Sequence, residues 1–207
     1  MNNKITGLKE EIARWAFEIR IKNRKSDWKI AFTNPTAGPW KTIKFFDDAG
    51  TLGEVYRYPL TEERPDILLV NDKLKLVLII EAKDSMPKLV IDTQVKKSVK
   101  VVSLLTKTLK ELGGNRFWGA RSSYKVIVGL LWGTTEASIS ATSRTLLFET
   151  YRSKLTKYKD IDSTYIVGIE SVYANDEIKC KIYIDEKPEG SSSLKSLIAE
   201  SFSGLDD

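Results

Sequence analysis

Two apolar runs on either side of a short polar turn constrain the fold of this chain more than any other feature. Residues 64–70 read Arg-Pro-Asp-Ile-Leu-Leu-Val and residues 74–83 read Leu-Lys-Leu-Val-Leu-Ile-Ile-Glu-Ala-Lys, with a turn at 71–73 between them. Two such runs predict adjacent antiparallel strands. The second run is apolar at nearly every position, so we expect a central strand with both faces covered.

This second strand ends in charged residues. Glu81 and Lys83 share one face, because side chains alternate along a strand. The position of Asp66 depends on the length of the turn. A two-residue turn places Asp66 diagonal to Glu81 and a four-residue turn places it directly opposite, with Cβ atoms ~5–8 Å apart. A three-residue turn places Asp66 on the other face.

Asp66 and Glu81 also predict a metal site. Like charges together at the end of a buried strand repel each other unless a cation lies between them. Oxygen ligands suit a hard ion such as Mg²⁺. One or two Mg²⁺ ions held there could supply a Lewis acid and activate water. We therefore expect a Mg²⁺ site at this strand end.

The same residues carry a family resemblance. Pro65-Asp66 and, after fourteen intervening residues, Glu81-Ala82-Lys83 resemble the motif of the PD-(D/E)xK nuclease superfamily, the restriction-endonuclease-like fold. The resemblance covers about twenty residues directly and otherwise only the order of the elements. It implies that Asp66, Glu81 and the Ala82 carbonyl bind the metal, and that Lys83 orients or helps to deprotonate the attacking water. An acid from the first helix often joins such sites.

Composition removes several other chemistries. The 207 residues contain no histidine and one cysteine, Cys180. A Ser-His-Asp triad, a Cys-His pair, histidine-bound zinc and an intramolecular disulfide are therefore excluded. The net charge of +5 is compatible with a polyanionic partner but does not require one. No run approaches the ~18 apolar residues of a transmembrane helix, so we expect no membrane span and a cytoplasmic location.

Periodicity and turn signals give the remaining elements. We expect a first helix over residues 6–20, a long helix over 90–112, a strand over 124–132 and a helix over 136–158. Further strands are expected at 40–46 and 54–58, a hairpin at 164–172 and 178–184, and a last helix at 191–202. This order predicts an α/β fold, a central mixed β-sheet flanked by helices on both sides. It resembles the αβββαβ core of the superfamily, in a single nuclease domain spanning residues 1–207.

The first helix supplies one more candidate residue. Its apolar stripe is expected to contain Leu8, Ile12, Trp15, Ala16 and Ile19. Glu11 lies at the margin of this stripe, so it is the candidate for the helix acid that the family resemblance implies. The alternative is that Glu11 is a solvated helix residue.

Two segments downstream have features of nucleic-acid binding and an equally valid structural explanation. The helix over 90–112 carries a row of lysines outside its apolar seam, which either bind phosphates or face solvent. The segment 115–121 interleaves arginine and aromatic residues among glycines, for base contacts or for packing against the core. Some exonuclease branches carry a glutamine and, four residues later, a tyrosine. In this chain the residue four positions after Gln94 is Ser98 and not tyrosine, which favours an endonuclease.

The function that the resemblance implies is Mg²⁺-dependent hydrolysis of double-stranded DNA, as in a type II restriction endonuclease. Such enzymes usually act as homodimers, because a two-fold interface matches a palindromic site. The alternatives are a junction-resolving or DNA-repair nuclease of the same fold, a non-catalytic DNA-binding module, and an interaction protein without a nucleic-acid partner.

Overall fold

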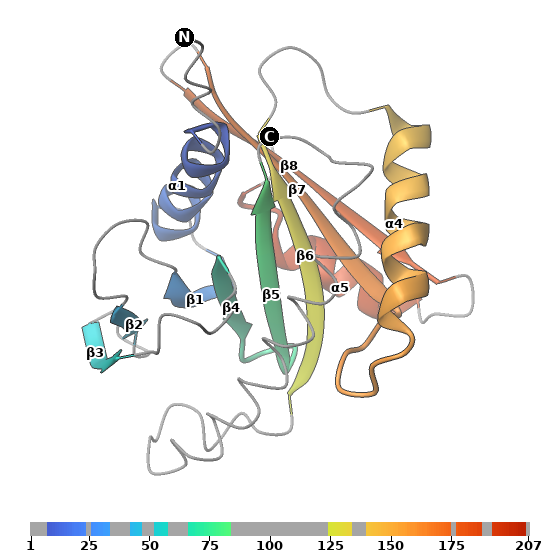
Figure 1. Cartoon of the computed structure of the whole chain (residues 1–207), viewed down its shortest axis with the longest axis horizontal. Coiled ribbons are helices and arrows are strands. Elements are labelled where there is room, and N and C mark those ends of the chain that lie inside the picture. Colours follow the sequence, from blue (N-terminus) through green and yellow to red (C-terminus); the bar gives the residue numbers. More distant parts are fainter. Residues whose placement is uncertain are drawn as a thin grey trace, which may run out of the picture.

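A mixed β-sheet with helices against both faces forms the described part of the chain (Figure 1). The computed structural model describes residues 8–23, 26–33, 42–46, 52–57, 66–83, 124–133, 140–174, 177–187 and 192–205. Its elements in chain order are α1 (Leu8–Asn23), β1 (Lys29–Thr33), β2 (Thr42–Phe46), β3 (Leu52–Arg57), β4 (Ile67–Asn71), β5 (Leu76–Lys83), β6 (Lys125–Trp132), α4 (Ala141–Leu155), β7 (Tyr165–Ala174), β8 (Glu177–Glu186) and α5 (Ser192–Ser201).

The sheet is mixed, as the order of the elements predicted. Among the described residues its strands lie in the order β3-β2-β1-β4-β5-β6-β7-β8. Strands β5, β6 and β7 are parallel to one another, and every other neighbouring pair is antiparallel. The sheet is strongly curled, with β5 and β6 running through its middle (Figure 1). The prediction that the strand ending in Lys83 is central is therefore confirmed.

Each predicted element within the described residues has a counterpart of the same type, with shifted ends, and there is one addition. Strand β1 was not predicted, because its five residues lie among turn signals and are too short to show a period. The expected strands at 40–46 and 54–58 correspond to β2 and β3, with shifted ends. The long helix expected over 90–112 and the segment 115–121 lie outside the described residues.

Alternating side chains give the sheet two apolar faces. Residues such as Val77, Ile79 and Val128 face α4, which contributes buried side chains including Phe148 and Tyr151. Residues such as Leu78 and Ile80 face the other side, where α1 and α5 pack. Helices thus cover both faces, as expected for an α/β fold. No helix among the described residues combines the length and apolar character needed to cross a membrane.

The buried face of α1 differs from the predicted stripe. Trp15 is 51% exposed and Ile12 is 38% exposed, whereas Ala13, Ala16 and Phe17 are buried. The small alanines let the helix backbone approach the sheet closely, and Phe17 fills the core where periodicity alone placed the larger Trp15. The predicted stripe was therefore wrong at Ile12 and Trp15 and right at Ala16, whereas Ile19 is half-buried and the Leu8 side chain lies outside the described residues.

A buried arginine fixes this orientation of α1. Arg20 is 9% exposed. Its guanidinium donates hydrogen bonds to the carbonyl oxygens of Leu205, at 3.2 Å, and Ile178, at 2.9 Å. Because a buried charge is tolerated only with such partners, these bonds tie α1 to β8 and to the segment after α5.

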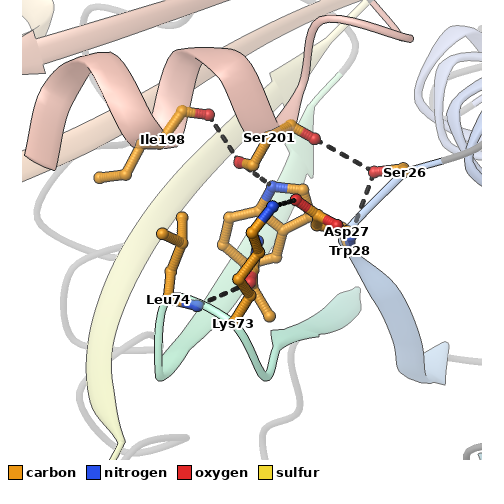
Figure 2. A network of polar contacts seen from close by, with 8 residues as sticks. Ser26, Asp27, Trp28, Lys73, Leu74, Ile198 and Ser201 are labelled. Carbon is orange, nitrogen blue, oxygen red and sulfur yellow. Dashed lines mark hydrogen bonds and ion pairs between the residues drawn. The ribbon is translucent and has the colours of Figure 1, made fainter.

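A polar network ties α5 to the start of β1 (Figure 2). The indole Nε1–H of Trp28 donates to Ser201 Oγ at 2.7 Å, and Ser201 Oγ donates to the carbonyl of Ile198 at 2.6 Å. The Trp28 ring also stacks on Phe202, with ring centroids 4.9 Å apart. Ser26 Oγ donates to the carbonyl of Ser201 at 3.3 Å. These contacts join segments more than 170 residues apart in the sequence.

Removing the acceptor of the Trp28 indole should destabilise the fold. Trp28 is 2% exposed, so Ser201→Ala leaves a buried N–H without its hydrogen-bond acceptor. We expect the free energy of unfolding to fall by about 1–3 kcal/mol, measured by urea denaturation. Ser203→Ala, in the same segment but exposed, is the control and should change it by no more than ~0.5 kcal/mol. Equal unfolding midpoints for the two variants would contradict the assigned role.

Candidate functional site

The turn between β4 and β5 sets the register of the hairpin. It contains four residues, Asp72 to Lys75, and pairs Asn71 with Leu76 and Ile67 with Ile80. Asn71 Oδ1 accepts a hydrogen bond from the Leu74 N–H at 2.9 Å, and Lys75 has a φ of 55°. This is the four-residue alternative. If the pairing of β4 with β5 is continued by one residue beyond Ile67 and Ile80, Asp66 lies opposite Glu81.

Asp66 itself bends away from the regular ladder at this point. Its N–H donates to the carbonyl of Ile80 at 3.1 Å. Its carboxylate Oδ2 accepts a hydrogen bond from the N–H of Ala82 at 2.7 Å. The Asp66 carboxylate therefore lies against the peptide that joins Glu81 to Ala82. The structure thus brings together the two halves of the predicted motif.

Glu81 is a buried carboxylate at the end of β5. It is 2% exposed, and alternation along β5 places it on the α4 face with Val77 and Ile79. Its neighbour in β6 is Leu130, which is also buried. A buried carboxylate carries a desolvation cost, which hydrogen bonds, an ion pair or a bound cation offsets.

Lys83 and Ala82 complete the strand end in different ways. Lys83 is half-buried and follows Glu81 on the same face. Ala82 is fully buried and packs its methyl group on the opposite face, against the cluster that contains Phe17. The N–H and C=O of one strand residue point to the same edge, so the Ala82 carbonyl lies on the edge that holds Asp66. It can therefore contribute an oxygen there.

The donor set fits Mg²⁺ better than a metal that needs a full protein cage. No group of three or more Asp, Glu, His or Cys side chains in the described parts of the chain is arranged to hold a metal ion. Mg²⁺ usually keeps several waters and binds through one or two carboxylates together with substrate oxygens. Asp66, Glu81 and the Ala82 carbonyl are the oxygen donors that could hold such an ion.

The fourth candidate side chain is not brought to the site by any described contact. The backbone of Glu11 belongs to α1, while its side chain lies outside the described residues. The choice of Glu11 depended on an apolar stripe that is not the buried face of α1. Gln94, Ser98 and the lysine-rich segment also lie outside the described residues.

A further buried carboxylate lies at the same end of the sheet, and sequence reasoning missed it. Glu170 on β7 is 6% exposed. The strand register places Lys83 beside Trp132 of β6, and Trp132 beside Glu170. Only the pairing of β6 with β7 brings Glu170 to this row, and a local sequence pattern does not contain that information. A charged residue inside an otherwise apolar strand was the available signal.

The chain matches no family model and no curated protein.

Proposed function

We propose that this chain is a Mg²⁺-dependent endonuclease that hydrolyses phosphodiester bonds in double-stranded DNA. One observation carries the proposal. The carboxylate of Asp66 lies 2.7 Å from the N–H of Ala82, beside the buried Glu81 and at the end of the central strand β5. The motif is therefore assembled by strand pairing, and it is more than a pattern in the sequence.

Each residue of the motif has a role that its position allows. Asp66, Glu81 and the Ala82 carbonyl would hold the metal ion. When bound, Mg²⁺ supplies a Lewis acid at the phosphoryl oxygen and makes water a stronger nucleophile. Lys83 lies on the face of Glu81, where its ammonium orients the attacking water and offsets the negative charge that develops at phosphorus.

The proposal extends to the fold and the class of enzyme. An antiparallel β4–β5 pair next to a parallel β5–β6 pair supports a restriction-endonuclease-like αβββαβ core. A type II restriction endonuclease acting as a homodimer is the form we propose first. A junction-resolving or DNA-repair nuclease is the second form, because it would use the same metal ligands.

A non-catalytic DNA-binding module is the competing function, and the same contact is compatible with it. The hydrogen bond from the Ala82 N–H to Asp66 satisfies a strand-end donor, which is what a purely structural aspartate would do. The position of the buried Glu81 beside Asp66 favours the nuclease instead, because two carboxylates at one strand end are the oxygen donors that a hard cation uses.

Incubation of the purified protein with plasmid and genomic DNA in Mg²⁺ separates these functions. A restriction endonuclease gives discrete fragments, and the sequence at their ends is always the same. A smear of fragments indicates a non-specific nuclease, and selective cleavage of branched DNA indicates a junction-resolving enzyme. Binding without any cleavage would contradict the proposed activity and leave the DNA-binding module.

A further inference from the structure

A stack of side chains extends from the candidate site toward α4. It begins at Trp132, which is 2% exposed and is the β6 neighbour of Lys83. The indole lies over Gly168 of β7. A Cβ at Gly168 would be 2.8 Å from Trp132 Cη2 and 2.5 Å from Phe148 Cζ, too close for any side chain. Glycine at position 168 therefore provides the space that the Trp132 ring occupies.

Tyr183 of β8 continues the stack and is fixed in two ways. Its ring lies nearly parallel to the Trp132 ring, with centroids 6.1 Å apart and an interplanar angle of 9°. Its hydroxyl donates a hydrogen bond to Glu170 Oε2 at 3.1 Å. Glu170 is nearly buried, so the acceptor of this hydrogen bond is held in place by the surrounding core. The Tyr183 ring is thus a rigid platform.

Arg144, near the start of α4, lies on this platform. Its guanidinium carbon is 3.8 Å from the centroid of the Tyr183 ring. A guanidinium stacks through its face and donates hydrogen bonds from its edge, so stacking and phosphate binding use different directions. Stacking also restricts the side chain in advance, which lowers the entropy that binding would otherwise cost.

The strand register relates Arg144 to the catalytic residues. Tyr183 is paired with Gly168, Gly168 with Leu130, and Leu130 with Glu81, so the platform lies in the same cross-strand row as Glu81. Three strand spacings separate the two ends of this row, roughly 14 Å. This is farther than one phosphodiester group can span. A phosphate at Arg144 is therefore a different one from the phosphate at Glu81.

We propose that Arg144 is a positioning residue that binds a backbone phosphate flanking the bond to be cut. The Trp132–Tyr183 stack and Glu170 hold the guanidinium in place for this contact. The inference rests on the proposed nuclease function and adds a residue from α4 to the DNA-binding surface. Because phosphates carry no sequence information, Arg144 contributes affinity and register, and no base specificity.

DNA binding measured in Ca²⁺ instead of Mg²⁺ tests the role without cleavage. For Arg144→Met we expect weaker binding of every DNA sequence tried. The slope of log K against log salt should become smaller in magnitude by about 1, as for the loss of one phosphate contact. Arg144→Lys should keep most of the slope but bind less tightly, because lysine neither stacks as a plane nor donates two parallel hydrogen bonds. Thermal unfolding of each variant verifies that it is folded.

Lys157→Met is the matched control, because it removes one positive charge from the exposed segment after the other end of α4. Its slope should equal that of the wild type. A wild-type slope for Arg144→Met would overturn the inference, as would equal slope changes for Arg144→Met and Lys157→Met. In either case, cleavage by the wild type would still support the nuclease. A wild-type protein that neither binds nor cuts DNA would overturn both proposals.

Discussion

Glu81→Gln is expected to abolish DNA cleavage while the protein remains folded. The amide has the size and shape of the carboxylate, so it fits the same buried position, but the negative charge that we propose binds Mg²⁺ is lost. Without metal, the urea midpoint should be unchanged or slightly higher. The reason is that an amide costs less to bury than a carboxylate, and Glu81 is 2% exposed. Initial rates of plasmid cleavage and urea unfolding measure the two effects.

Glu149→Gln is the control for Glu81→Gln. Glu149 lies on α4 and is exposed, so its substitution changes the net charge equally without touching the strand end. We expect wild-type cleavage from this variant. If Glu81→Gln also cuts DNA at the wild-type rate, Glu81 is not a metal ligand and the assigned site is wrong.

Lys83→Ala is expected to lower the cleavage rate by about 10²-fold or more, the lower range for a positioned proton-transfer group. Lys83 is half-buried at the end of β5, and thermal unfolding of the variant verifies that it is folded. DNA binding in Ca²⁺ should survive, because one ammonium is a small part of an interface with many phosphates. Single-turnover cleavage and a binding isotherm separate the two properties.

Lys75→Ala is the control for Lys83→Ala. Lys75 is the last residue of the turn at the opposite end of β5, where its ammonium is 3.2 Å from the hydroxyl of Tyr124. We expect no loss of cleavage. Equal losses at Lys75 and Lys83 would indicate general electrostatic attraction of DNA instead of a positioned lysine.

The hairpin could be predicted from the sequence because its information is local. Continuous apolar residues on β4 and β5 require cover on both faces, and this requirement is met on both sides of the sheet. The turn length stayed open between two and four residues. In the structure, the bond from the Leu74 N–H to Asn71 and the positive φ of Lys75 close a four-residue turn. The length of this turn depends on the geometry of individual side chains and of the backbone, which cannot be predicted from the pattern of apolar residues.

The features that were missed depend on contacts between distant segments. Periodicity did not decide between Trp15 and Phe17 as the core residue of α1. Residues two positions apart lie about 200° apart around a helix, so α1 carries large apolar side chains on nearly opposite sides, and only packing against the sheet chooses between them. The position of Arg144 over Tyr183 requires the pairing of three strands and the crossover through α4. The sequence around Arg144 contains no pattern from which this arrangement could be predicted.

The metal requirement of cleavage tests the account most directly. Supercoiled plasmid is incubated with the purified protein in Mg²⁺, in excess EDTA, and in EDTA followed by excess Mg²⁺. Because Asp66 and Glu81 are acidic and neither can stabilise negative charge at phosphorus without a cation, we predict cleavage in Mg²⁺, none in EDTA, and recovery when Mg²⁺ is restored. Full cleavage in excess EDTA would contradict the assignment of Asp66 and Glu81 as metal ligands.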